Sequence, residues 1–265
     1  MNRKIIFFDI DGTIFCTQLG HVTDKVKAAI AQAQSRGHLC FIASGRPWAF
    51  IAENIRELGF DGYVLANGAH IKYQDMDAGI RYLDRQLVRD LCKNFRQGNI
   101  QYILSTPAHA YIDPTFTGLL KFFGKCNIDF QNLVHDFDEE LIFHETLKLE
   151  AWADTQEQVD FAAKCCGGFA NEIHGPGETI EIYGKHVSKA TGIRRVLDML
   201  RLPVEDSFCF GDGPNDVEMF ETVGNGFAME NGVDVVKKLA KEICPDVEKD
   251  GVAVKLAQLF ERGVL

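Results

Sequence analysis

Short apolar runs and helix-like apolar spacings alternate along the first third of the chain. The run at residues 4–8 predicts a buried strand, and the apolar positions within 26–33 follow helical spacing after Thr23, a candidate N-cap. The pattern then repeats as strand, helix and strand at 39–43, 47–58 and 63–66. This alternation predicts right-handed βαβ units and a parallel sheet covered on both faces.

The pattern changes between residues 69 and 83, where the turn-rich cluster Asp75 to Gly79 predicts a hairpin. A helix followed by two strands then occurs twice, once over about 87–112 and once over about 159–183. We expect these units to form an inserted α+β domain over 84–184, with boundaries uncertain by about four residues.

Alternation of helices and strands resumes after the insertion, with predicted elements at 193–200, 207–210, 226–229 and 252–260. The first domain is therefore expected to be discontinuous, covering 1–83 and 185–265. The predicted fold class is α/β, with a doubly wound, Rossmann-like parallel sheet as the core and an α+β insertion.

Composition narrows the classes of partner. The chain has 265 residues, 46% of them hydrophobic, and a net charge of −10, so its surface should repel polyanions and nucleic acid is not an expected partner. No apolar run approaches the roughly 20 residues of a membrane span. The apolar run Ile5 to Phe8 is too short for a secretory signal, which favours a cytoplasmic protein; no particular oligomeric state is indicated.

The eight cysteines are scattered and none forms a C-x-x-C pair. Without a secretory signal, this pattern favours reduced thiols over disulfides or zinc ligands.

Two carboxylates follow the first predicted strand. Asp9 and Asp11 are two residues apart, a spacing that points both side chains the same way in extended chain. In an open parallel sheet, the carboxyl ends of the strands face the ligand crevice. Taken alone, the pair more often marks an ordinary turn.

Three further segments carry polar residues at predicted strand or helix ends. Ser44 and Gly45 end the second strand and open the helix expected at 47–58, where backbone N–H groups bind anions. Lys189 begins a helix, where a cation is unfavourable unless an anion lies nearby. A glycine-rich turn with two carboxylates occupies residues 211–216. Each segment has an ordinary reading as a helix cap, a solvated lysine or a loop, but together they bring complementary groups to one sheet edge.

At these positions the sequence resembles the haloacid dehalogenase superfamily. Members carry D-x-D-G-T, a Ser or Thr, a Lys and G-D-x-x-N-D, found here at Asp9 to Thr13, Ser44, Lys189 and Gly211 to Asp216. The S-G-R sequence at Ser44, the Asn67-Gly68-Ala69 stretch and the insertion of about a hundred residues resemble the Cof-type branch. In that branch the insertion is an α/β cap, so the resemblance implies that 84–184 is a cap domain.

The resemblance implies a role for each motif. Asp9 would attack phosphorus and become an aspartyl phosphate, and Asp11 would be the general acid and base. Mg²⁺ would be held by Asp9, the backbone carbonyl of Asp11, and Asp212. The remaining candidates are Lys189 as a catalytic cation, Ser44, Gly45, Arg46 and Asn215 as phosphate- or substrate-binding residues, Asp216 as a partner of Lys189 or of metal-bound water, and Thr13 as a support of the loop behind Asp9.

The function implied is a Mg²⁺-dependent phosphatase acting on small phosphorylated metabolites, with sugar phosphates first. Asp11 favours this subclass because a phosphatase must protonate a leaving alkoxide. Two alternatives stay open: a phosphomutase using the same aspartyl phosphate, and a catalytically silent sensor of a phosphorylated ligand. A sensor would need neither the nucleophile Asp9 nor the acid Asp11.

Overall fold

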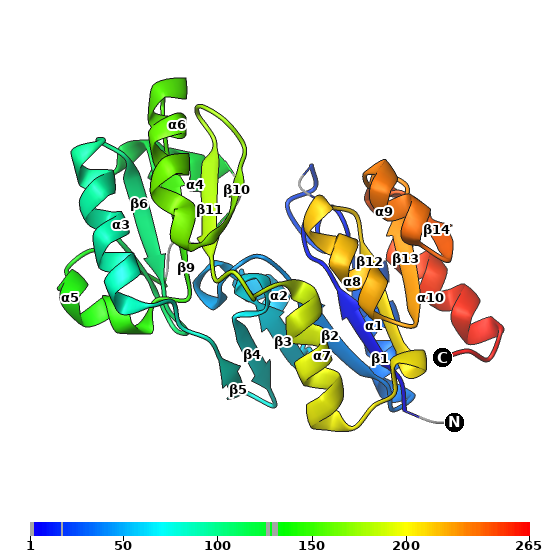
Figure 1. The fold of residues 1–265 in the computed structure, drawn as a ribbon. Helices are drawn as coiled ribbons and strands as arrows, with labels where there is room; N and C mark the ends of the chain where they lie inside the picture. The colour runs from blue at the N-terminus through cyan, green and yellow to red at the C-terminus, as the bar shows by residue number, and fades with distance from the viewer. Residues whose placement is uncertain (1–2, 17, 126–127, 129–131) are drawn as a thin grey trace. The chain divides into compact units, whose positions relative to one another are not determined.

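The computed structural model describes residues 3–16, 18–125, 128 and 132–265. The chain divides into two compact units (Figure 1). The first unit comprises Met1–Gly45, Glu53–Ala78 and Ser188–Leu265, and the second comprises Arg46–Ala52 and Gly79–Val187. The assignment of the short segment 46–52 to the second unit has no counterpart in the predicted boundaries.

An eight-stranded sheet forms the centre of the first unit, in the order β14-β13-β12-β1-β2-β3-β4-β5. Neighbouring strands from β14 to β3 are parallel, and β3 pairs with β4 in the antiparallel sense. The strands are β1 (Ile5–Phe8), β2 (Leu39–Ala43), β3 (Gly62–Leu65), β4 (His70–Tyr73), β5 (Met76–Ile80), β12 (Ser207–Gly211), β13 (Asn225–Met229) and β14 (Glu242–Cys244).

The central strands of this sheet are buried on both faces. All four residues of β1 are fully buried, as expected of a central parallel strand whose side chains alternate between two covered faces. Ile5 and Phe7 pack in a hydrophobic cluster with Ile193 of α7 and Met219 of α8. The helices of the unit are α1 (Asp24–Ser35), α2 (Glu53–Arg56), α7 (Lys189–Leu200), α8 (Val217–Thr222), α9 (Asp234–Leu239) and α10 (Gly251–Glu261).

The second unit has its own six-stranded sheet, in the order β10-β11-β9-β6-β7-β8. Helices α3 and α6 cover one face of it (Figure 1), through a cluster that includes Val88, Phe95 and Val159. Its elements are α3 (Arg85–Gln97), β6 (Gln101–Ser105), β7 (Ala110–Ile112), α4 (Thr117–Lys125), β8 (Leu133–Val134), α5 (Glu139–Ile142), β9 (Lys148–Trp152), α6 (Gln156–Cys165), β10 (Ala170–Ile173) and β11 (Thr179–Tyr183).

The predicted fold class is confirmed, and most predicted elements lie within a few residues of their expected positions. Thr23 accepts a hydrogen bond from the Val26 backbone N–H and caps α1, as expected. The hairpin expected at 69–83 consists of β4 and β5. Its turn, however, falls at Gln74 and Asp75, before most of the predicted turn cluster. Both residues have positive φ (49° and 63°), which two-residue hairpin turns often require.

The prediction of one helix over 47–58 is wrong. Pro47 is extended and precedes a single 3₁₀ turn, Trp48–Phe50, while α2 begins only at Glu53. Ala49 and Phe50 are buried against Phe123 and other residues of a second cluster in the second unit. The apolar spacing of this segment therefore reflects packing in two different units rather than one helical face.

None of the helices in the described part of the chain is long and apolar enough to cross a membrane. The seven cysteines in the described ranges are free thiols, in line with the expectation of reduced cysteines, whereas Cys126 lies outside those ranges.

Candidate active site

The loop after β1 turns back sharply. Backbone N–H groups of Thr13, Ile14 and Phe15 all donate to the carbonyl of Ile10. Gly12 has a φ of +76°, and a β-carbon there would lie 2.3 Å from Asp212 Oδ2. Only glycine satisfies both the backbone conformation and this close approach. Thr13 Oγ1 donates to Asp212 Oδ1 at 2.7 Å, so this loop and the loop after β12 are held together.

A lysine joins the loops after β1 and β12 by contacting a carboxylate of each. Lys189 is the first residue of α7, which the capping box of Ser188 and Thr191 begins. Its Nζ lies 2.6 Å from both Asp9 Oδ1 and Asp216 Oδ1, and 3.4 Å from Asn215 Oδ1. Its side chain is 1% exposed, which excludes the ordinary reading of a solvated surface lysine.

Burial sets the protonation behaviour of this cluster. Burial raises the pKa of Asp9, and the neighbouring carboxylates raise it further while Lys189 opposes the shift. Burial also raises the pKa of Asp212 to about 6, against the opposing hydrogen bond from Thr13. For Lys189, burial lowers the pKa, but the carboxylates of Asp216 and Asp9 outweigh it and hold the ammonium charged.

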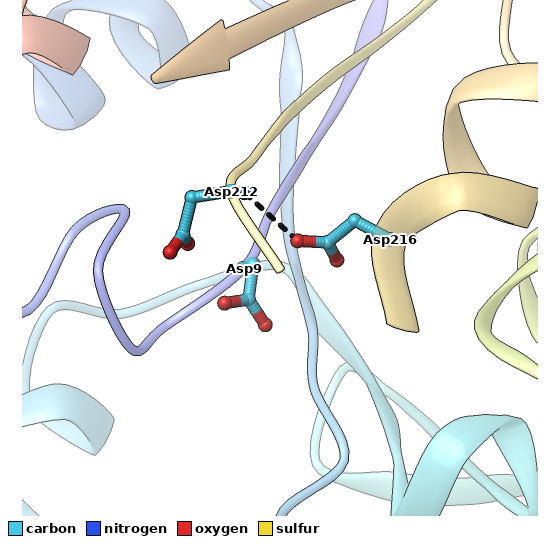
Figure 2. Close-up of side chains that lie close together, drawn as sticks. All are labelled: Asp9, Asp212 and Asp216. Carbon is cyan, nitrogen blue, oxygen red and sulfur yellow. Dashed lines mark hydrogen bonds between the residues drawn. The ribbon is translucent and has the colours of Figure 1, made fainter. Parts of the chain in front are cut away.

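Asp216 organises the loop after β12. Its Oδ2 accepts a hydrogen bond from the backbone N–H of Asp212 at 2.9 Å (Figure 2). The same oxygen accepts from the backbone N–H of Gly213, also at 2.9 Å. With Lys189 on Oδ1, both oxygens of Asp216 already have strong donors. Asp216 therefore shapes the loop and orients the lysine.

Three carboxylates lie close enough to share a cation. One oxygen each of Asp9, Asp212 and Asp216 lie within 4.8 Å of one another (Figure 2). Oxygen-only donors and more negative charge than Lys189 can neutralise suit a hard divalent cation. Because the oxygens of Asp216 are engaged, Asp9 and Asp212 fit direct ligation best.

The other residues expected at the site lie in two groups. Ser44 is buried directly after β2. A β-carbon at Gly45 would lie 3.5 Å from Asn215 Nδ2, so Gly45 lies beside Asn215, which in turn contacts Lys189. The helix N-terminus expected to follow Ser44 is absent, because the chain bends at Gly45 and Arg46 and Pro47 is extended before a single 3₁₀ turn.

Arg46 and Asp11 make up the second group, and Asp11 is near enough to Asp9 and Asp212 that its charge raises the pKa of both carboxyls. Arg46 belongs to the second unit, where its guanidinium donates to the carbonyl of Phe50 at 3.1 Å. Asp11 is exposed, and its carboxylate is not among the three that share the cation-sized space.

Asn67 is a residue that the sequence analysis did not place at the site. It lies in the 3₁₀ turn η2 (Ala66–Gly68) after β3, and its backbone N–H donates a hydrogen bond to the carbonyl of Ser44 at 3.3 Å. The Asn-Gly pair at a strand end, which favours left-handed backbone, was the available signal.

The first unit is a doubly wound α/β sheet with carboxylates after its strands and a buried lysine at the start of α7. This arrangement is typical of α/β enzymes that bind an anionic ligand beside a cation. The chain belongs to the haloacid dehalogenase-like hydrolase family, whose model matches residues 6–256. The resemblance predicted from the motifs is thereby confirmed.

Several relatives span nearly the whole chain. It is 28% identical to the Bacillus subtilis protein named "Putative phosphatase YkrA", covering 98% of both chains. It is 25% identical to 5-amino-6-(5-phospho-D-ribitylamino)uracil phosphatase YitU of Bacillus subtilis, covering 97% of both. A haloacid dehalogenase-like hydrolase structure from Bacteroides thetaiotaomicron has the same fold, with a TM-score of 0.86 at 21% identity over 97% of this chain and 100% of that one.

Proposed function

We propose that the chain is a cytoplasmic, Mg²⁺-dependent phosphatase that hydrolyses small phosphomonoesters, sugar phosphates first, through an aspartyl phosphate on Asp9. In this proposal, 1–83 and 185–265 form the catalytic core and 84–184 its cap. Phosphatases among the relatives support the activity, and the phosphorylated ribityl group in the name of one of them supports the substrate class.

The environment of Asp9 carries the proposal. A buried carboxylate whose Oδ1 is held at 2.6 Å by a buried lysine is oriented, and the same lysine can attract a phosphoryl group. Ser44, Gly45 and Asn215 would add a second anion-binding contribution, since Asn215 contacts that lysine and Gly45 lies beside Asn215. Phosphoryl transfer depends mainly on such positioning and charge stabilisation.

In the first displacement, an oxygen of Asp9 forms a bond to phosphorus while the bond from phosphorus to the ester oxygen breaks. Asp11 gives its proton to that oxygen, so the leaving group departs as an alcohol. In the second displacement, the carboxylate of Asp11 takes a proton from water, whose oxygen attacks the same phosphorus. The bond to Asp9 breaks, and inorganic phosphate is released.

Asp9, the backbone carbonyl of Asp11, and Asp212 would hold Mg²⁺, as the oxygen donors described above permit. When bound, the ion supplies positive charge that offsets repulsion between the phosphate and the carboxylates. Thr13 keeps the Asp212 carboxylate turned toward Asp9 through its hydrogen bond.

A phosphate-release screen tests the proposal. The panel comprises sugar phosphates, nucleotides, pyridoxal phosphate and flavin mononucleotide, each with Mg²⁺ and with chelator. We expect Mg²⁺-dependent release that is abolished in Asp9→Asn, whose amide is a poor nucleophile and a poor metal ligand. Wild-type turnover in that variant would contradict the mechanism. Phosphate moved within a sugar without release would indicate a mutase, and binding without any turnover would indicate a sensor.

A further inference from the structure

Asn67 carries two buried polar atoms that the rest of the described chain does not satisfy. The residue is 3% exposed, and neither its Oδ1 nor its Nδ2 has a hydrogen-bond partner within the described ranges. A side-chain amide offers two N–H donors and one acceptor oxygen. Each buried polar group without a hydrogen bond costs about 1–3 kcal/mol, so two such groups on one side chain need an explanation.

The backbone at this position does not supply that reason. Asn67 has φ 54° and ψ 28°, in the left-handed region, which glycine adopts without a steric cost and asparagine tolerates. Glycine would meet the conformational requirement and bury no amide. The amide therefore has a role separate from the shape of the turn.

The surroundings of Asn67 are those of the proposed phosphate site. A β-carbon at Gly45 would lie 2.9 Å from Asn67 Oδ1 and 3.5 Å from Asn215 Nδ2, so the missing side chain of Gly45 leaves these two amides facing the same point. Asn215 in turn contacts the Lys189 ammonium. On its other side, Gly68 packs so closely on Ser188 that a β-carbon would lie 2.2 Å from the Ser188 carbonyl oxygen.

We propose that Asn67 contacts the substrate, its Nδ2 donating to a phosphoryl oxygen and its Oδ1 accepting from a hydroxyl group of the leaving group. This inference rests on the proposed phosphatase function. The dianionic phosphoryl group of a monoester offers acceptors but no donor, so that group alone leaves Oδ1 unsatisfied. A phosphomonoester with a hydroxyl near its ester oxygen, such as a polyol or sugar phosphate, satisfies both ends of the amide.

The test compares two esters that differ only in hydroxyl groups, glycerol 3-phosphate and propyl phosphate. In Asn67→Gly the amide is removed and the left-handed backbone is kept. We expect kcat/KM for glycerol phosphate to fall about tenfold more than for propyl phosphate. The reason is that the substrate hydroxyl loses its acceptor and is left without a hydrogen bond. Inhibition by inorganic phosphate should weaken about fivefold, because the Nδ2 donor is also lost.

Two further variants separate this role from a structural one. Asn99 also has positive φ (51°) but is exposed and lies in the second unit, so Asn99→Gly is a matched control that should leave both esters and phosphate inhibition unchanged. Asn67→Asp keeps an acceptor and loses the donor, so it should retain the preference for glycerol phosphate. Inhibition by inorganic phosphate should weaken at least as much as in Asn67→Gly, because the new carboxylate also repels the anion.

Each other outcome overturns the inference. Equal losses for the two esters in Asn67→Gly remove the hydroxyl contact, and unchanged kinetics with a lower melting temperature make Asn67 purely structural. These results are distinct from failure of the proposed function, which would appear as no phosphate release from any ester, p-nitrophenyl phosphate included, by the wild-type protein.

Discussion

Lys189 shows how a single buried cation holds the site together. It is 1% exposed and lies between Asp9 and Asp216, at 2.6 Å from an oxygen of each. Without it, two buried carboxylates would face each other with no counter-charge. Removing one partner of a buried ion pair costs about 3–5 kcal/mol, so this lysine should matter for folding as well as for the proposed phosphate binding.

We therefore expect Lys189→Met to lower both the free energy of unfolding, by about 3–5 kcal/mol, and kcat/KM, by roughly 10²–10³-fold. Urea unfolding and phosphate-release kinetics measure the two effects. Adding Asp9→Asn should recover part of the stability and none of the activity.

A matched control for this variant is Lys255→Met. Lys255 is also buried, pairs with Glu242 at 3.1 Å and lies away from the site, so its loss should lower stability and leave kcat/KM per folded molecule unchanged. If Lys189→Met changed neither quantity, its place in the proposed mechanism would be lost.

The proposed acid role of Asp11 predicts a dependence on the leaving group. Protonation helps when the leaving oxygen is basic, so Asp11→Asn should slow aspartyl-phosphate formation from alkyl phosphates by about 10²–10⁴-fold and spare p-nitrophenyl phosphate in part. Single-turnover kinetics are needed, because Asp11 would also activate water in the second displacement. Equal losses for both esters would show that Asp11 acts through its backbone carbonyl or the loop instead.

Among the residues after strands, those that carry charge or a hydroxyl were predicted as a site, whereas Asn67 was noted only within a family motif. Asp9, Ser44 and Asp212 follow buried strands, and parallel topology alone brings such residues to one edge. The burial of Lys189 depends on carboxylates that are 180 and 27 residues away, and only the conjunction of motifs pointed to them. The significance of Asn67 depends on which atoms fail to find partners, a property that sequence patterns do not contain.

Among the elements, the prediction failed where two units share one stretch of chain. Trp48, Ile51 and Ile55 have helical spacing, yet the chain turns once, extends and starts α2 only at Glu53. Burial of Phe50 in the second unit overrides local propensity, which is a weak determinant next to tertiary packing. Long amphipathic elements such as α3 and α7 were predicted because one face of each packs on one core.

The sheet of the second unit contains a second buried ion cluster, across β9 and β11. Glu150 and Glu181 are directly opposite each other in the antiparallel register, an unfavourable pairing of like charges. Lys148 is 1% exposed and lies 2.9 Å from Glu150 Oε1 and 2.6 Å from Glu181 Oε2. Burial raises the pKa of Glu150, with Lys148 opposing the shift.

Lys148→Met should therefore destabilise the second unit by about 3–5 kcal/mol, and a further Glu150→Gln change should recover part of the loss. Hydrogen exchange at the amides of β9 and β11 measures the effect within this unit. Lys185→Met, a change at an exposed lysine of the same unit, serves as the control and should have little effect. Unchanged exchange in Lys148→Met would mean that the ion cluster contributes nothing net.

For the whole molecule, the division into two units predicts a local response to metal. If Asp9 and Asp212 hold Mg²⁺, binding at a hundred times the dissociation constant should stabilise the first unit by about 2.7 kcal/mol. Hydrogen exchange should slow in β1, β12 and their following loops, and remain unchanged in β6 and β9. Asp212→Asn should remove the response, and equal slowing in both units would contradict a site confined to the first.

Segment 46–52 has a consequence for exchanging parts between relatives. Ala49 and Phe50 complete the hydrophobic cluster around Phe123, although they are encoded more than 60 residues before it and lie between two stretches of the first unit. A chimera with breakpoints only at 78/79 and 187/188 would combine Phe50 from one parent with Phe123 from the other. The second unit therefore consists of two separate pieces of chain, 46–52 and 79–187, and a chimera that preserves its packing must take both from the same parent.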